Sequence, residues 1–287
     1  MAEPIVVGVD GSTSSLQAAA WAGDEASLRG APLRIVYAAL RWPYHVPLVP
    51  QPASWDADAE AAVDDMLHQA IIRARAGMPY LEVSTQIVQG ATGEALVAAA
   101  EDAQLLVVGN RGRGGFAELL LGSVSRYVTA RAPCPVAVVR QAADGVRGEI
   151  TVGVTGHPDQ ESVLDFAFRE AALRHATLRA VHAWTHPAAA APGGTHPVVH
   201  ADVESVGAEE ARLLAESIAG RREDFPDVAL TQRVVCAHPA KALIQASAET
   251  DLVIVGARTG AAALLGLGAT AHAVLHHSRA PVIVVRH

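Results

Sequence analysis

Short runs of β-branched and aliphatic residues alternate along this chain with longer segments rich in alanine. In the first half we place strands near residues 5–10, 33–39, 83–88, 104–109 and 135–140, and helices near residues 13–29, 56–76, 92–101 and 122–131. This alternation is typical of βαβ units, in which helices cover both faces of a parallel sheet. Right-handed crossovers between five such strands predict an α/β fold with an open, doubly wound sheet.

The second half of the chain repeats the first. IVVGVDG near the beginning is matched by ITVGVTG, and PVAVVR is matched by PVIVVRH at the end. Gly8 and Gly153 are equivalent glycines 145 residues apart, which indicates a tandem duplication. The second unit is therefore expected to hold strands near residues 150–155, 178–184, 229–236, 251–256 and 281–286. We expect one domain at residues 1–140, a polar linker, QAADGVRGE, at 141–149 and a second domain at 150–287.

The composition excludes several classes of partner. A chain of 287 residues with 51% hydrophobic and 4% aromatic residues fits two compact α/β domains. Its net charge of -8 gives no general electrostatic reason to bind nucleic acid or an anionic membrane. The sequence shows neither a signal-peptide pattern nor an apolar run of ~18 residues. We therefore expect a cytoplasmic protein with no nucleic-acid partner and no membrane partner.

The cysteines and histidines suggest no metal site. Cys134 and Cys236 form no CxxC pair, and we interpret both as buried free thiols. His272 and His276 have the spacing of a two-histidine ligand pair on a helix, but no HExxH motif accompanies them. We interpret these two as surface or interface histidines.

Three other histidines stand outside that helix. We expect His182 to be packed at the end of a strand. His196 and His200 fall in the stretch APGGTHPVVH, whose Ala, Pro and Gly content predicts a mobile loop between the second strand and the second helix of the second unit.

A glycine-rich loop, GNRGRGGFAELLLGSVS, follows the fourth strand of the first unit. Ligands of a doubly wound sheet bind beyond the carboxyl ends of its strands, which places this loop beside Asp10 at the end of the first strand. Glycine accepts positive φ and lets a ligand approach the backbone. The free N–H groups at the start of the following helix favour phosphate oxygens. The loop is therefore a candidate phosphate site.

The side chains of the loop allow two interpretations. Arg111 and Arg113 could make charge-assisted contacts with phosphate, and Ser123 and Ser125 could donate from their hydroxyls. Alternatively, Ser123 is a helix N-cap, Gly122 is a tight turn and the arginines are solvated.

Other nucleotide-binding and catalytic motifs are absent from the sequence. The loop lacks the GxxxxGK[ST] of a Walker A motif, and a dinucleotide GxGxxG would follow the first strand rather than the fourth. The chain contains no SGGxDS motif of a pyrophosphatase-type ATP synthetase, no nucleotidylyltransferase HxGH and no GxSxG elbow. We assign no catalytic residue, although slow ATP hydrolysis stays open because a nucleotide held near arginines has some of the parts of phosphoryl transfer.

The spacing G-x2-G-x9-G-[ST] after the fourth strand, with the aspartate in VGVDGS, resembles the universal stress protein family. The duplication is similar to the tandem members common in actinobacteria. The resemblance implies a Rossmann-like fold and an ATP-binding regulator of stress response or growth arrest rather than a vigorous enzyme. It also implies a homodimer, and Mg²⁺ bridging the phosphates, for which we assign no protein ligand. The positions that match the family's ATP site are Asp10, Gly11, Ser12, Ala39, Val108, Gly109, Arg111, Gly112, Gly122, Ser123, Val124 and Ser125.

The second unit departs from that pattern at several contact positions. Thr155 replaces the aspartate, Ala269 replaces the first serine of the helix, and Thr259 or Gly260 stands where the second glycine of the loop is expected. Gly256 and Gly268 persist, but the loop is one residue shorter. We therefore expect the second unit to bind ATP poorly or not at all; alternatively, Arg258 and the helix start hold it in an altered pose.

The last strand of each unit, PVAVVR or PVIVVRH, lies at a predicted sheet edge and could pair the two halves as a pseudo-dimer. Three hypotheses remain for function. The first is an ATP-dependent regulator with an unidentified protein partner, the second a weak ATPase or phosphotransferase, and the third a nucleotide-free assembly scaffold.

Overall fold

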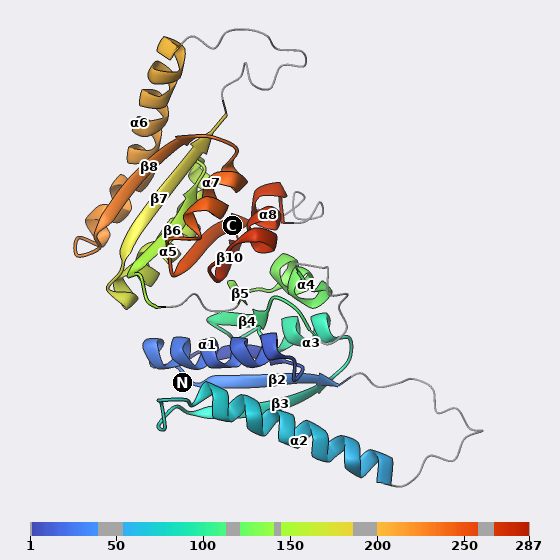
Figure 1. Cartoon of the computed structure of the whole chain (residues 1–287). Coiled ribbons are helices and arrows are strands. Elements are labelled where there is room, and N and C mark those ends of the chain that lie inside the picture. The colour runs from blue at the N-terminus through green and yellow to red at the C-terminus, as the bar shows by residue number, and fades with distance from the viewer. Residues whose placement is uncertain are drawn as a thin grey trace, which may run out of the picture. The chain divides into compact units, whose positions relative to one another are not determined.

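The chain forms two compact units, Met1–Gln141 and Ala142–His287, in a computed structural model (Figure 1). The structure describes residues 2–39, 54–112, 121–140, 145–185, 200–257 and 267–286. Of the predicted site residues, Arg113 in the first unit and Arg258, Thr259 and Gly260 in the second lie outside these ranges, as does His196.

The first unit is built on a parallel sheet with the strand order β3-β2-β1-β4-β5. Right-handed crossovers place α1 and α2 on one face and α3 and α4 on the other, and the helices of each pair contact one another. The chain reverses its winding between β1 and β4. The elements are β1 (Ile5–Val9), α1 (Thr13–Arg29), β2 (Leu33–Ala39), α2 (Ser54–Ala74), β3 (Val83–Gln89), α3 (Thr92–Ala99), β4 (Leu105–Gly109), α4 (Ser123–Arg131) and β5 (Val136–Val139).

The second unit repeats this topology, with the strand order β8-β7-β6-β9-β10. Its elements are β6 (Glu149–Val154), the short 3-10 helix η1 (Pro158–Gln160), α5 (Glu161–Arg174), β7 (Thr177–Trp184), α6 (His200–Asp224), β8 (Leu230–Cys236), α7 (Pro239–Ala246), β9 (Leu252–Ala257), α8 (Ala269–His277) and β10 (Val282–Arg286). The predicted fold class, two doubly wound parallel α/β sheets in tandem, is confirmed. The expectation that His200 lies in a loop is wrong, because this residue begins α6.

The central strands pair in the same register in both units. Ile5 pairs with Leu105 where β1 meets β4, and Ile150 pairs with Leu252 where β6 meets β9. Parallel strands in register end at the same edge of the sheet, so the residues that follow β1 and β4 are neighbours in space. The same geometry brings together the residues that follow β6 and β9.

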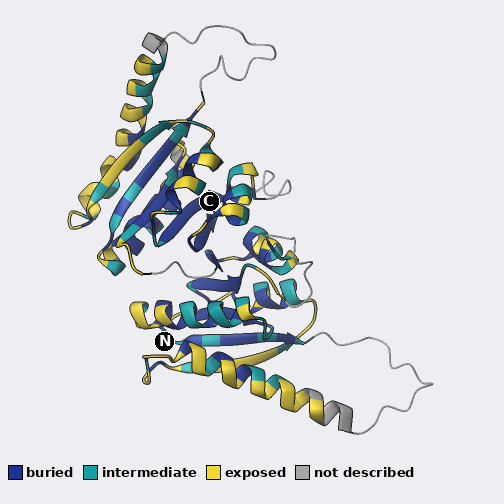
Figure 2. Ribbon diagram, viewed as in Figure 1, coloured by how far each residue is buried: buried dark blue, intermediate teal, exposed yellow. Residues whose placement is uncertain are grey.

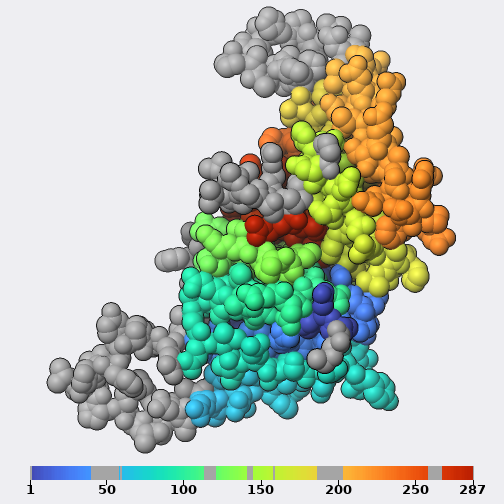
Figure 3. Space-filling view, turned by 180° about the vertical axis from the view of Figure 1, so that it is seen from behind, coloured from blue at the N-terminus to red at the C-terminus, as the bar shows by residue number. Residues whose placement is uncertain are grey.

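The core of each unit lies on the central strands (Figure 2). Every residue of β1 and β4 is buried, as expected for parallel strands that are covered by helices on both faces. The outer strands β3 and β8 are largely exposed. Much of α6 is exposed too, and its side chains lie at the surface of the second unit in the space-filling view (Figure 3).

Two kinds of ion pair occur at equivalent positions in both units. Glu25 is 2% exposed and accepts from Arg29 at 2.6 Å within α1, and Glu170 pairs with Arg174 in the same way within α5. The second kind joins a strand to the segment that follows a helix. In the first unit Arg34 binds both carboxylate oxygens of Asp102, each at 2.9 Å. In the second unit the equivalent arginine, Arg179, binds Glu249 at 3.0 Å. The duplication therefore extends to charged contacts that hold helices and strands together.

The two cysteines differ in their surroundings. Cys134 is a buried free thiol as expected, and burial raises its pKa to about 11. Cys236 is exposed, so its expected burial is wrong. The reason is its position at the end of β8, an edge strand with one neighbour in the sheet.

No helix among the described residues is long and apolar enough to cross a membrane.

Candidate functional site

A tight turn at the end of β1 orients Asp10. Gly11 has a φ of 78°, a left-handed conformation that favours glycine. The Asp10 carboxylate accepts from the backbone N–H of Ser12 at 3.0 Å, and the N–H of Asp10 donates to the Ser15 hydroxyl at 3.2 Å. Ser12 is also the N-cap of α1, because its hydroxyl accepts from the Ser15 N–H. These contacts hold the Asp10 carboxylate at the carboxyl edge of the sheet.

The loop that follows β4 packs directly on the first turn of α1. A Cβ placed on Gly109 would lie 2.5 Å from the Ser14 hydroxyl oxygen, so only glycine permits this approach. The Ser14 hydroxyl donates to the Asn110 side chain at 2.7 Å, and the Ser12 hydroxyl reaches the carbonyl of Arg111 at 3.5 Å. The turn after β1 and the loop after β4 therefore form one connected surface.

Gly112 lies against the Asp10 carboxylate. A Cβ on this glycine would be 2.5 Å from Oδ2 of Asp10, closer than side-chain carbons come to other atoms in proteins. The φ of Gly112 is outside the left-handed region. A side chain at this position would therefore have to displace the Asp10 carboxylate, whereas the backbone conformation accepts residues other than glycine.

Helix α4 begins beside the same loop. Its N-cap is Gly122, whose N–H donates to the Asn110 carbonyl at 2.8 Å. The interpretation of Ser123 as an N-cap is therefore wrong, and no side chain of the described residues caps α4. Because the N-cap residue has no side chain, the N–H groups of the first turn remain available to an anion.

The two serines of α4 have different environments. Ser123 is exposed. Ser125 is 4% exposed, and its hydroxyl donates to the Gly109 carbonyl at 2.7 Å. The expected hydroxyl donor at Ser125 is therefore directed at the backbone of β4, where it fixes α4 to the loop.

Two arginines lie near one another at this edge. Burial lowers the pKa of Arg140, and the charge of Arg111 lowers it further, which places the two guanidinium groups within electrostatic reach of each other. Arg140 follows β5, and the carbonyl of Val139 accepts from the Asn110 N–H at 3.0 Å. Arg140 was missed by the sequence reasoning. The available signal was its position directly after a strand that neighbours β4.

The structure unites most of the predicted positions. It brings together Asp10, Gly11, Ser12, Gly109, Arg111, Gly112, Gly122 and the first turn of α4, which contains Ser123, Val124 and Ser125. Val108 is 3% exposed within β4. Ala39 ends β2, and its carbonyl accepts from the Gly90 N–H at 3.2 Å. In the sheet Ala39 pairs with Gln89 of β3, whereas the pairing of β1 with β2 ends at Val9 and Tyr37.

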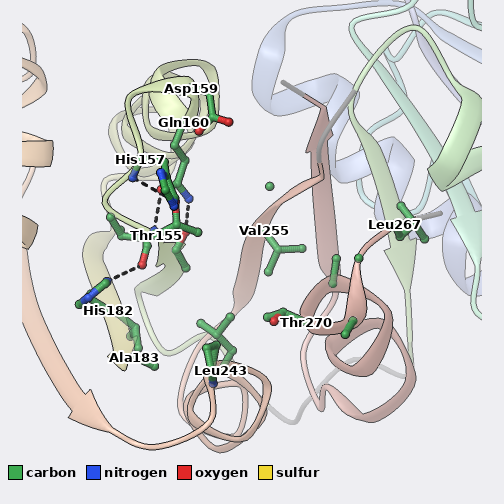
Figure 4. A pocket seen from close by; sticks show the side chains of 18 residues that line it. Thr155, His157, Asp159, Gln160, His182, Ala183, Leu243, Val255, Leu267 and Thr270 are labelled. Carbon is green, nitrogen blue, oxygen red and sulfur yellow. Dashed lines mark hydrogen bonds between the residues drawn. The ribbon is translucent and has the colours of Figure 1, made fainter. Parts of the chain in front are cut away.

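The second unit keeps the turn and loses the carboxylate. The N–H of Thr155 donates to the Gln160 side chain at 2.7 Å (Figure 4), whereas the N–H of the equivalent Asp10 donates to the Ser15 hydroxyl. The N–H of His157 donates to the Thr155 hydroxyl at 3.3 Å, where Ser12 donates to the aspartate. A threonine hydroxyl thus replaces a negative charge while the hydrogen-bond pattern of the turn is preserved.

The histidines singled out from the sequence lie in two places in the second unit: His182 on β7, and His272 and His276 on α8. His182 is buried at the end of β7 as predicted; its Nδ1 lies 2.8 Å from the Val154 carbonyl and its Nε2 lies 2.7 Å from the Glu210 carboxylate. The rings of His272 and His276 have centroids 4.4 Å apart. The described residues contain no group of three or more side chains arranged to hold a metal ion.

Sequence comparisons with known proteins match both units of this chain. The model of the universal stress protein family matches residues 1–140 and 147–286. A universal stress protein of Mycobacterium bovis is 36% identical over 291 residues, which cover 98% of this chain and 96% of that protein. One from Mycobacterium tuberculosis is 37% identical over 297 residues, with the same coverage.

The fold of this chain is also similar to that of a solved structure. The crystal structure of a universal stress protein from Archaeoglobus fulgidus covers 99% of this chain and 96% of its own, with a TM-score of 0.71 at 17% identity. The family match over both units and the mycobacterial relatives together show that this chain belongs to the universal stress protein family, as a member with two tandem family domains.

Proposed function

We propose that the first unit binds ATP and that the chain acts as a nucleotide-dependent regulator in stress response or growth arrest. The observation that carries this proposal is the convergence of Asp10, the Gly109–Gly112 loop and the uncapped start of α4 at the winding reversal between β1 and β4. Ligands of doubly wound sheets bind at such a position.

Each part of this edge suits a different part of a nucleotide. The N–H groups at the start of α4 and the arginines Arg111 and Arg140 favour phosphate oxygens. The Asp10 carboxylate is an acceptor that suits the hydroxyls of a ribose. Gly112 leaves room for a ligand to approach the carboxylate. Mg²⁺ would neutralise charge on the phosphates, and we assign it no protein ligand.

Regulation follows from the contacts that join the elements of the site. Because Ser12, Asn110 and Ser125 tie α1, the loop and α4 together, a nucleotide that contacts these elements would favour one arrangement of them. A protein partner or a second subunit that prefers this arrangement would then bind more tightly. A homodimer, and a pseudo-dimer of the two domains, remain part of this proposal.

The test is the release of bound nucleotide from freshly purified, denatured protein. Wild-type protein should release ATP, and Gly122→Glu should release little, because the new carboxylate stands where phosphate is expected. The matched control is Gly220→Glu, at an exposed position of α6 with open space around its Cα. ATP retained equally by Gly122→Glu and by the control would contradict the site.

The same preparation separates the two other hypotheses. A slow ATPase would form product over time and would lose this activity in Asp10→Ala while other properties of the fold persist. A nucleotide-free scaffold would carry no nucleotide and bind none. The charge of Arg111 lowers the pKa of Arg140, and two arginines this near the proposed phosphate position keep ATP hydrolysis open as a second candidate.

A further inference from the structure

Strand β3 forms the outer edge of the sheet in the first unit (Figure 1). Its seven residues pair one to one with Leu33–Ala39 of β2, without a bulge, and no other described strand lies beside it. The middle of the strand, residues 84–87, is exposed, and Ile87 is 53% exposed. Helix α2 packs on α1 and β2. A regular, exposed edge of this kind can pair with a strand from another chain.

The backbone groups of alternate β3 residues point away from β2. The Leu33 N–H donates to the Glu82 carbonyl at 2.9 Å, and the Gly90 N–H donates to the Ala39 carbonyl at 3.2 Å. Even-numbered residues of this segment therefore direct their backbone groups towards β2. Because successive residues of a strand point their N–H and C=O groups to opposite sides, the odd-numbered residues direct theirs to the open edge. These residues are Val83, Thr85, Ile87 and Gln89.

The side chains of β3 contain none of the usual obstacles to edge pairing. The strand VSTQIVQ has no charged residue and no proline, and these are the residues that commonly block an exposed edge. Val83, Thr85, Ile87 and Val88 are β-branched, which favours pairing in a sheet. The edge therefore suits an uncharged strand as its partner.

The outer strand of the second unit, β8, differs from β3 at its middle residue. Gln86 and Arg233 are each the middle residue of a seven-residue strand. Gln86 pairs with Val36 and Arg233 with Val181, and both valines lie opposite the equivalent glycines of the repeat. When a strand pairs antiparallel with its own copy around the middle residue, that residue meets its counterpart. Two arginines would repel one another there, whereas two glutamine amides can exchange hydrogen bonds.

We propose that two copies of this chain associate through antiparallel pairing of their β3 strands around Gln86. In this register Thr85 of one copy lies opposite Ile87 of the other, and Val83 lies opposite Gln89. All four residues direct their backbone groups to the open edge, so each of these pairs exchanges two hydrogen bonds. The two Gln86 side chains meet at the symmetry axis of a closed, isologous dimer.

The interface is small, because it consists of one edge of seven residues. Standard stable interfaces bury roughly 1,200–2,000 Å². We therefore expect a reversible dimer with a Kd of about 10–100 µM. The proposal assigns a surface to the second-copy contact of the proposed function, and it requires no bound ATP.

The test is analytical ultracentrifugation of the nucleotide-stripped full chain between about 1 and 300 µM. The wild-type chain should form dimers as its concentration rises. Gln86→Lys places two positive charges at the symmetry axis and should raise the Kd of the dimer at least about tenfold. The matched control is Gln232→Lys, the same substitution at an exposed position of β8, and it should leave dimerisation unchanged.

A charge swap separates loss of pairing from loss of the fold. Gln86→Glu should weaken dimerisation as Gln86→Lys does. An equal mixture of the two variants should associate at least as tightly as the wild type, because opposite charges then face one another. Hydrogen exchange gives the local readout: the Thr85 and Ile87 amides should exchange more slowly at high protein concentration, and the Gln232 amide should not.

Three results would overturn the proposal: a wild-type chain that stays monomeric at about 300 µM, a dimer that survives Gln86→Lys, or a mixture of the two charged variants that stays monomeric. Failure of the proposed function would instead appear as a wild-type chain that binds no ATP, whatever its oligomeric state.

Discussion

Replacement of Gly112 by alanine would separate nucleotide binding from folding. The added Cβ would lie 2.5 Å from Oδ2 of Asp10, whereas ordinary contacts begin at 3.4 Å, so the carboxylate must move by about 1 Å. The end of a short side chain can move at little cost to the fold. Gly112 also has a φ that alanine accepts. The loss of the carboxylate position, rather than backbone strain, is therefore the expected effect.

The magnitude follows from the contact that is lost. A hydrogen bond to a charged group contributes about 1.5–3 kcal/mol, so displacement of the Asp10 carboxylate from a ribose should weaken ATP binding roughly tenfold to a hundredfold. The free energy of unfolding should change by less than about 1 kcal/mol, since the change is local and lies in a loop. Titration calorimetry with ATP on nucleotide-stripped protein and urea unfolding measure the two effects.

The control is Gly220→Ala, the same substitution at an exposed helical glycine of the second unit. It should leave ATP affinity unchanged and stabilise the fold by roughly 0.5–1 kcal/mol, because alanine loses less entropy than glycine in a helix. Unchanged ATP affinity in Gly112→Ala would refute the role assigned to Asp10. A large loss of stability would show instead that the contact supports the fold.

Four further predictions concern stability and reactivity. Glu25→Ala leaves the charge of Arg29 without its buried partner in α1 and should lower the free energy of unfolding by about 3–5 kcal/mol in a urea titration, and a loss under about 1 kcal/mol would contradict the buried pair. A thiol reagent at about pH 8 should modify Cys236 and spare Cys134, because burial raises the pKa of Cys134 to about 11, and mass spectrometry after limited labelling would reveal the reverse. The raised pKa also predicts that Cys134 lowers stability as the pH rises from 9.0 toward 11, where the unfolded thiol ionises first. Asp251→Ala removes the acceptor of three backbone N–H groups at residues 147–149 and should cost the second unit about 1–3 kcal/mol, with faster hydrogen exchange at those amides as the local readout.

The sequence predicted the meeting of Asp10 with the Gly109–Gly112 loop because strand order alone determines that contact. Once β1 and β4 are parallel neighbours, their carboxyl ends must lie together whatever the surrounding side chains do. The tandem repeat predicted the strands of the second unit in the same way, because equivalent sequence segments take equivalent places in the sheet. The helix start at Gly122 was also predictable, since a glycine before Ser-Val-Ser is compatible with helix entry.

Other features depend on contacts that no local pattern encodes. The direction of the Ser125 hydroxyl depends on the packing of α4 against β4, and the sequence shows only a serine near a helix start. Arg140 joins the site because β5 lies beside β4, which a search for motifs in one loop does not reveal. The exposure of Cys236 follows from the edge position of β8. Gln160 is buried against the turn after β6, although the sequence alone would place this polar residue at the surface.

The central claim is the proposal that ATP binds to the first unit and not to the second. The most direct measurement is the number of ATP molecules bound per full chain at saturation, by calorimetry on nucleotide-stripped protein. The account predicts one ATP per chain in the wild type and none in Gly122→Glu. Two ATP molecules per chain, or one that persists in Gly122→Glu, would contradict it.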